Sequence, residues 1–154
     1  MKEKIKSLFY IFLPIILGSI LGFIIKDSYK YYENLNRPPL NPPKILFPIM
    51  WSIIYLLMGI SYYLFKKEYK NTNKEVRNSY YIQLTINLLW SIIFFVFKFK
   101  FFSIVWILLL LIAVFNLYSV LKPLKRISSY LLIPYILWIG FATYLTIGIY
   151  ILNR

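Results

Sequence analysis

The sequence predicts an all-α membrane protein, a single domain over residues 1–154 that forms a bundle of five transmembrane helices. The first observation is composition: 60% of residues are hydrophobic and 15% charged, whereas a soluble domain is about half apolar and about a quarter charged. The second is that charge is absent from five windows of 19 or more residues: 7–25, 45–65, 78–97, 101–121 and 127–153. Since about 20 helical residues cross a bilayer, each window predicts one span.

The first span is expected at about residues 5–26. Its basic start (Lys2, Lys4 and Lys6) is like that of a signal peptide, but its apolar run is longer than the usual 7–15 residues and no small-residue cleavage site follows. We therefore expect a retained helix. Gly18 and Gly22 are four residues apart, a spacing typical of close helix contact, either in the bundle or in a dimer.

The segment that follows, residues 27–43, is rich in tyrosine and proline. Four of the eight prolines of the chain fall within residues 38–43, and proline fixes φ and favours a stiff, extended path. A plain linker has no need of such stiffness. We expect this segment to be a lid over one mouth of the bundle.

The second span is expected at about 44–65, and it carries Trp51, Tyr55, Gly59 and Tyr62 on one helical face. Tryptophans near span ends usually belong to the interfacial aromatic belt, but Trp51 lies deeper than a belt residue requires. A functional aromatic pocket is the alternative. The polar loop that follows, 66–78, is expected to be solvated.

The third span, at about 78–98, places Gln83, Asn87, Trp90 and Phe94 on one face. Asn87 lies near the middle of the span, where an unpaired amide would cost free energy. It therefore faces another helix, a cavity or a ligand rather than lipid. The simplest interpretation is a hydrogen bond between helices, and contact with a ligand is the other.

The fourth and fifth spans are expected at about 101–122 and 127–152. The turns at 98–100 and 122–126 are short and force antiparallel neighbours. In the last span Trp138, Ala142 and Leu145 share a face, and Trp138 is again deeper than a belt position.

Several classes of function are excluded by composition. The chain has no histidine and no cysteine, which excludes disulfides, histidine or cysteine metal sites and histidine-based triads. All five acids lie outside the spans, which argues against a proton-coupled pump and against paired-carboxylate hydrolysis in the bundle. The net charge of +13 is divided between two membrane surfaces, whereas a nucleic-acid-binding protein gathers it on one face.

Counting lysine and arginine on alternate sides predicts the orientation. Eleven lie on the side of the N-terminus and seven on the other, so the positive-inside rule places the N-terminus in the cytoplasm and the C-terminus outside. The Lys-, Ile- and Asn-rich composition suggests an AT-rich bacterial genome and hence a bacterial plasma membrane.

From Tyr31 to the C-terminus, about four-fifths of the chain, the sequence resembles the translocator protein family (TspO/MBR, also called tryptophan-rich sensory protein or peripheral benzodiazepine receptor). The matching pattern is Tyr32, Leu35, Arg37-Pro38, Pro42-Pro43, Phe47, Trp51, Tyr55, Met58-Gly59, Gln83, Asn87, Trp90-Ser91, Phe94-Phe95, Pro134-Tyr135, Leu137-Trp138 and Phe141–Leu145. Three positions depart from the family pattern: Lys44-Ile45 replaces a frequent Gly-Trp, Trp106 replaces an acid, and Thr146 replaces a frequent asparagine.

The resemblance implies a ligand pocket that opens toward the first loop and a homodimer that needs no cofactor. The implied ligands are hydrophobic tetrapyrroles such as protoporphyrin IX or haem-related compounds, and also sterols and benzodiazepine-type molecules. Family pocket positions correspond to Tyr32, Trp51, Asn87, Trp90, Trp138 and Ala142, with Pro42, Phe47, Tyr55 and Leu145 as second choices.

The leading hypothesis is a membrane receptor or transporter for such tetrapyrroles, in which Asn87 supplies a directional hydrogen bond. One alternative is a light- and oxygen-dependent porphyrin-degrading enzyme, for which the resemblance points to Trp51 and Trp138 as the catalytic residues. Another is a ligand-modulated scaffold or a small-drug exporter, although the missing intramembrane acid argues against the exporter.

Overall fold

A computed structural model describes residues 1–70 and 72–154, and all regular structure in these two ranges is helical. Five helices are long and apolar enough to cross a membrane, which confirms the predicted fold class. The crossing helices are α1 (Lys2–Ile25), α3 (Leu46–Tyr69), α4 (Lys74–Ser91) with its π-helical continuation η2 (Ile92–Val96), α5 (Lys100–Leu121) and α7 (Ile133–Leu152). Short helices are η1 (Lys26–Ser28), α2 (Tyr29–Glu33) and α6 (Arg126–Tyr130).

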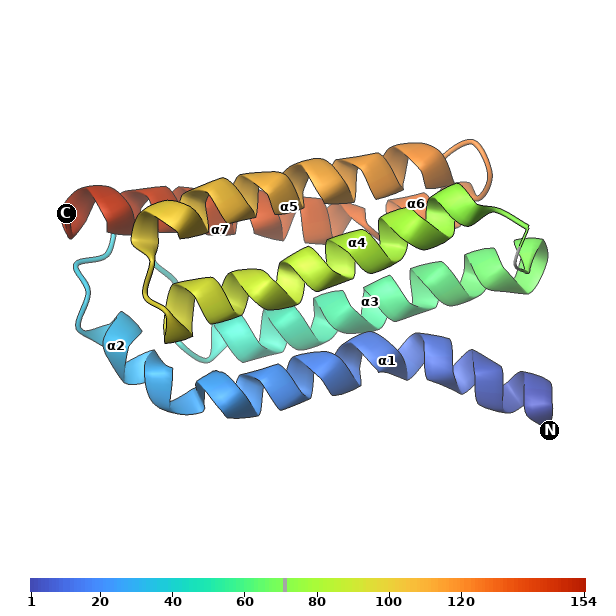
Figure 1. The fold of residues 1–154 in the computed structure, drawn as a ribbon, viewed down its shortest axis with the longest axis horizontal. Helices are drawn as coiled ribbons and strands as arrows, with labels where there is room; N and C mark the ends of the chain where they lie inside the picture. Colours follow the sequence, from blue (N-terminus) through green and yellow to red (C-terminus); the bar gives the residue numbers. More distant parts are fainter. Residues whose placement is uncertain (71) are drawn as a thin grey trace.

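The long helices form an antiparallel bundle (Figure 1). α1 packs along α3, α4 packs along α5, and α5 packs along α7. The chain termini lie at opposite ends of the bundle, as an odd number of crossings requires, and α2 lies at the end that holds the C-terminus (Figure 1). We call this end the lid end and the other the N-terminal end.

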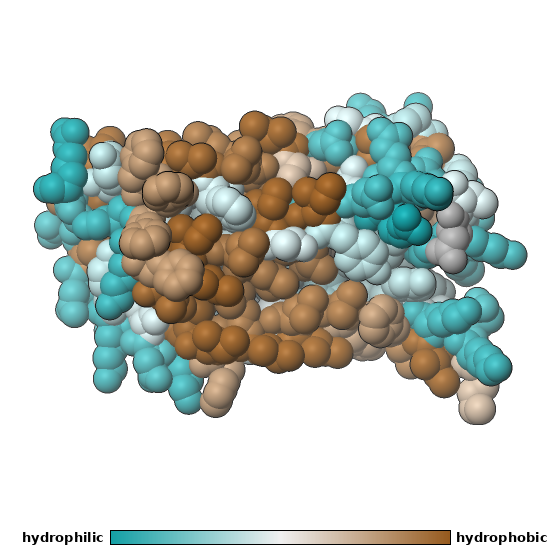
Figure 2. Space-filling model, in the orientation of Figure 1, coloured by the Kyte–Doolittle hydropathy of each residue, from teal (hydrophilic) through white to brown (hydrophobic). Residues whose placement is uncertain are grey.

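The surface shows where the lipid lies. A broad apolar band crosses the middle of the molecule, and hydrophilic residues gather at both ends (Figure 2). Phe12 of α1 and Ile112 and Phe115 of α5 are among the exposed side chains. Because helices satisfy their backbone hydrogen bonds internally, they are stable in such surroundings. The protein is therefore a multi-pass membrane protein.

At the N-terminal end of the bundle, the helices extend beyond the predicted boundaries. α3 continues to Tyr69 and α4 begins at Lys74, so most of the predicted loop 66–78 is helical. Windows without charge mark only the part of a helix that lies in lipid, and a helix continues into water wherever it is capped. Here the Asn73 side chain accepts a hydrogen bond from the Val76 backbone N–H at 3.0 Å, a standard N-cap.

The lid segment is only partly extended, which corrects the expectation for residues 27–43. Its first part is helical in η1 and α2, and the chain leaves helical structure only after Glu33. The tyrosines at 29–32 precede the first proline at 38, so nothing in that part of the segment prevents a helical turn. The predicted fifth span is also interrupted, by a turn between α6 and α7 ahead of Pro134.

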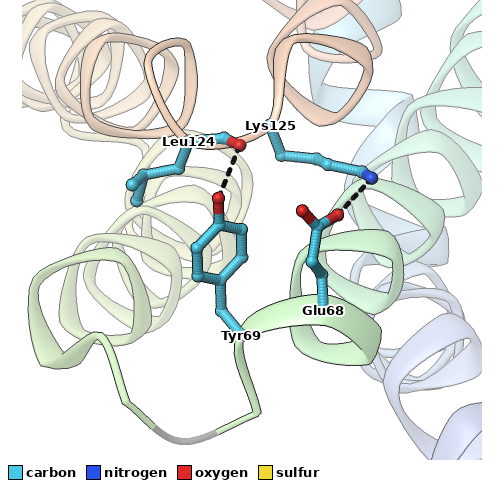
Figure 3. A network of polar contacts seen from close by, with 4 residues as sticks. All are labelled: Glu68, Tyr69, Leu124 and Lys125. Atoms are coloured by element: carbon cyan, nitrogen blue, oxygen red, sulfur yellow. Dashed lines mark hydrogen bonds and ion pairs between the residues drawn. The ribbon is translucent and has the colours of Figure 1, made fainter.

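Polar contacts join the elements at the N-terminal end (Figure 3). Glu68 of α3 forms an ion pair with Lys125, and the Tyr69 hydroxyl donates to the Leu124 carbonyl at 2.9 Å. Deeper in this half, the rings of Tyr62 and Tyr80 stack with centroids 3.9 Å apart. These contacts hold α3 against α4 and against the turn between α5 and α6. The N-terminal half of the bundle is therefore tightly packed between these elements.

Candidate ligand-binding site

A cavity of about 280 Å³ lies in the lid half of the bundle, between α1, α2, α3, α4–η2 and α7. Eight of the ten residues predicted from the sequence line it: Tyr32, Phe47, Trp51, Tyr55, Trp90, Trp138, Ala142 and Leu145. They come from four separate elements and are brought together by the fold.

Three tryptophans form one wall of this cavity. The Trp51 ring centroid lies 6.4 Å from that of Trp90 and 6.5 Å from that of Trp138, the latter at right angles. Trp51 also stacks on Tyr55 with centroids 5.7 Å apart. Aromatic groups at these separations and angles attract one another and present flat, polarisable faces. The cavity wall therefore suits a flat, apolar ligand.

Two of these indoles have unused hydrogen-bond donors. The Nε1 groups of Trp90 and Trp138 are buried and have no hydrogen-bond partner within residues 1–70 and 72–154. Trp106, outside the cavity, instead donates its Nε1–H to the Ile86 carbonyl at 3.0 Å. An unsatisfied buried donor costs about 1–3 kcal/mol. Both nitrogen atoms are covered by the protein itself, so these donors lie within the packed wall and not at the surface of the cavity.

Asn87 lies behind the wall rather than in it, because it is fully buried and does not line the cavity. Its Oδ1 accepts from the Tyr55 hydroxyl at 2.7 Å, and its Nδ2 donates to the Tyr135 hydroxyl at 2.6 Å. Tyr135 in turn donates to Gln83 Oε1 at 3.0 Å. The Asn87 amide thus joins helices, as in the first of its two interpretations, and one of its bonds positions the cavity residue Tyr55.

Pro42 also lies outside the cavity wall. It adjoins Asn41, whose Oδ1 accepts a hydrogen bond from the Tyr32 hydroxyl. The edge of the Tyr32 ring meets Phe47, with centroids 5.6 Å apart. The proline-rich segment therefore contributes to the site by holding Tyr32.

The sequence patterns did not predict that α1 contributes to the cavity. Gly18, Gly22 and Ile25 of α1 line the cavity, as does Tyr29 at the start of α2. A Cβ on Gly18 would lie 2.3 Å from the Tyr55 ring, whereas Gly22 has open space beside it. The spacing of the two glycines was the one feature of the sequence that pointed to this part of α1. Within this chain, the absence of side chains at these positions makes space for the Tyr55 ring and for the cavity.

The lid is fastened to the C-terminal half of α7. Asn153 Nδ2 donates to the Asn36 carbonyl at 2.7 Å, and its Oδ1 accepts from the Asn36 backbone N–H at 2.9 Å. The Tyr144 hydroxyl donates to the Pro39 carbonyl. Buried Pro38 packs on Gly148, where a Cβ would come within 2.6 Å of the proline ring.

The cavity wall is uncharged among the described residues. The nearby basic groups are at the lid: the Arg37 guanidinium lies 5.6 Å from the centre of the Tyr32 ring, and Lys44 pairs with Glu33. The site can thus bury an apolar ring system and meet acidic substituents only at its mouth.

Comparison with known proteins agrees with this geometry. A model of the TspO/MBR family matches residues 10–152. The chain belongs to the TspO/MBR family. Its relatives include a "Tryptophan-rich protein TspO" of Archaeoglobus fulgidus, 33% identical over 131 residues that cover 85% of each chain. A protein of the same name from Chlorobaculum tepidum is 34% identical, over 85% of this chain and 84% of the relative. The "Translocator protein" of Ovis aries is 29% identical, over 83% and 79%.

The family match includes the whole of the candidate site. The matched range 10–152 contains all the residues that line the cavity, including those of α1 that lie before Tyr31, where the resemblance seen in the sequence begins. The cavity is therefore built entirely from the part of the chain that this TspO/MBR protein shares with its family.

Proposed function

We propose that this TspO/MBR protein is a membrane receptor or transporter that binds flat, hydrophobic tetrapyrroles, such as protoporphyrin IX, in the cavity of the lid half. The observation that carries the proposal is the convergence of Trp51, Trp90 and Trp138 on one uncharged cavity. A macrocycle matches such walls by stacking, and burial of its apolar faces supplies the main driving force. Its acidic substituents would extend to Arg37 at the lid.

In this function the tetrapyrrole is a transported molecule or a signal, and it is not a permanently bound cofactor. Sterols and benzodiazepine-type molecules are also flat or apolar. We propose that they bind in the same cavity and compete with the tetrapyrrole. A homodimer is part of the proposal as well, although the cavity is lined within one chain.

Titration of the purified protein in detergent with protoporphyrin IX, followed by the Soret absorbance of the porphyrin, tests the assignment. Trp51→Ala removes a stacking surface, and Trp138→Phe replaces an indole with a smaller aromatic ring. We expect Trp138→Phe to raise Kd about fivefold, the equivalent of about 1 kcal/mol, because the smaller ring stacks less well. Trp51→Ala should raise Kd more, because more apolar contact is lost.

Trp106→Phe is the matched control, because it removes an indole that bonds Ile86 outside the cavity. Its Kd should equal that of the parent protein. Unchanged porphyrin affinity in both Trp51→Ala and Trp138→Phe, with folded protein, would refute the binding site.

Light-dependent breakdown of a bound porphyrin is the alternative function proposed for Trp51 and Trp138. It is favoured by the placement of Trp51 and Trp138 on one wall, where a bound macrocycle would touch both indoles. Illumination of the complex in air tests it. Soret absorbance that decays only when both tryptophans are present supports degradation, and decay at the rate of free porphyrin supports binding alone.

A further inference from the structure

A second hollow lies at the N-terminal end of the bundle, away from the lid. It has a volume of about 340 Å³ and is formed by the first turns of α1 and the last turns of α3. Four lysines line it: Lys6 from α1, Lys66 and Lys67 from α3, and Lys70, which directly follows α3. The proposed tetrapyrrole site makes no use of these residues.

The hollow arises from the way the two helices meet. At Gly59 of α3 a Cβ would lie 2.1 Å from the Ile11 carbonyl oxygen, so the backbones are in close contact there. Pro14 lies inside α1 and, without an N–H, removes one helical hydrogen bond and bends the helix. The first turns of α1 diverge from α3 toward the N-terminus (Figure 1), and the hollow occupies the space between them.

The charges around the hollow are strongly unbalanced. Glu3 is the one acidic residue among the described residues that line it. Glu68 follows Lys67 directly in the sequence but pairs with Lys125 on the other side of α3 (Figure 3). The Lys66 ammonium lies 5.5 Å from the centre of the Tyr10 ring, a cation–π contact that holds it at the wall. The hollow therefore favours an anion.

The depth of the hollow matches the headgroup region of a bilayer. Lys6 directly precedes the first charge-free window, and Lys66 directly follows the second. Basic residues at span ends reach the interface. Below the hollow, on the face of α3 that carries Tyr63 and Lys67, Leu56 and Ile49 are exposed to lipid. An anion held by these lysines would thus lie directly above an apolar helix face.

We propose that this hollow binds the phosphate-bearing headgroup of an anionic phospholipid, with its acyl chains along the exposed face of α3. A phosphate ester matches a pocket of several ammonium groups, and basic pockets between transmembrane helices bind such headgroups. A soluble phosphate compound offers the same anion but would gain nothing from Ile49 and Leu56, so the apolar face favours the lipid.

The backbone of Lys70 fits this assignment. Lys70 ends α3 with φ at 48°, a conformation that glycine adopts at little cost and other residues rarely adopt. A lysine at this position supplies an ammonium at the expense of local stability. Lys70→Gly is therefore a variant that removes the charge and keeps the turn.

Titration of the full-length protein in detergent with dioctanoyl phosphatidylglycerol, followed by native mass spectrometry and thermal unfolding, tests the proposal. We expect saturable binding and a raised Tm, and weaker binding of dioctanoyl phosphatidylcholine. Lys70→Gly should lower affinity for phosphatidylglycerol about fivefold, and Lys6→Gln combined with Lys67→Gln should lower it more, since each lysine near the surface adds attraction.

Lys74→Gln is the matched control, because Lys74 begins α4 at the same end of the bundle and does not line the hollow. It should bind phosphatidylglycerol like the parent protein. An equal loss in Lys74→Gln would show diffuse surface charge in place of a site. Equal affinity for phosphatidylcholine, or for glycerol phosphate without acyl chains, would also overturn the proposal. Protoporphyrin binding at the lid half should be unaffected in all variants.

Discussion

A single amide organises the wall of the candidate site. Asn87 of α4 accepts from Tyr55 of α3 and donates to Tyr135 of α7, so three helices meet at one buried side chain. In a membrane the bonds between helices are each worth about 0.6 kcal/mol, and at most about 1.7. In the proposed binding site, the part of Asn87 is therefore to place the Tyr55 ring, which stacks on Trp51.

Asn87→Leu tests this indirect role. The substitution keeps the volume but leaves the Tyr55 hydroxyl without its acceptor, so we expect a loss of about 1–2 kcal/mol in unfolding free energy and a several-fold weaker protoporphyrin affinity. The control is Asn116→Leu, which removes a bond to Ser79 between α5 and α4 and should affect stability alone. Equal porphyrin affinity in both variants would separate Asn87 from the site.

Gly59 provides a second prediction at the scale of one residue. A methyl group there would collide with the Ile11 backbone at 2.1 Å, and backbone cannot move aside as a side chain tip can. Gly59→Ala should therefore destabilise the protein by about 1–3 kcal/mol in thermal unfolding. Gly140→Ala, with open space around it, should be neutral or stabilising because alanine favours helix. A stable Gly59→Ala protein would contradict the close α1–α3 contact.

Among the elements, the lid segment is attached to the bundle mainly through α7. It is joined to α7 by Asn36–Asn153 and Tyr144–Pro39 hydrogen bonds and by the contact of Pro38 with Gly148. Tyr32, which lines the cavity, belongs to the same segment. Release of the lid from α7 would therefore loosen one wall of the site.

Gly148→Ala should weaken this attachment, since the added methyl would lie 2.6 Å from the Pro38 ring. We expect faster association and dissociation of protoporphyrin in stopped-flow measurements, with dissociation accelerated more, and little change in the rest of the bundle. Asn153→Ala removes the hydrogen bonds without adding bulk and should act in the same direction. Unchanged rates in both variants would show that the ligand enters elsewhere.

The charge-free windows predicted the five crossings because hydrocarbon excludes charge along the whole of each span. They could not predict that α3 continues to Tyr69, since a helix outside lipid is governed by caps such as Asn73. The pairing of Asn87 with Tyr55 and Tyr135 also depends on three helices far apart in sequence, and periodicity within one helix leaves such partners open.

Some of the cavity residues could be predicted from local sequence patterns, and others could not. Trp51 and Trp138 were predicted because they are deeper than interfacial residues and match the family pattern. Trp90 was predicted because it shares a face with Asn87 and matches the same pattern. The part of α1 around Gly22 was missed, since an apolar helix facing a cavity has the same composition as one facing lipid.

The whole molecule has two chemically different ends. The lid end holds the aromatic cavity and its uncharged wall, and the N-terminal end holds the basic hollow between α1 and α3. Eleven of the 18 basic residues belong to the N-terminal end. Cytoplasmic surfaces carry the excess of lysine and arginine and face the anionic leaflet. The orientation that this bias predicts would place the proposed lipid site inside the cell and the lid outside.

Single-cysteine labelling tests this orientation directly, because the natural chain has no cysteine. Asn34→Cys places a thiol on the exposed lid, and Thr72→Cys places one between α3 and α4 at the opposite end. With a membrane-impermeant maleimide we expect Asn34→Cys to react on intact cells and Thr72→Cys to react only after lysis. The reverse pattern would place the cavity mouth in the cytoplasm and the basic hollow outside. In that case ligand would reach the lid from within the cell, and the eleven-to-seven charge bias would have failed to set the topology.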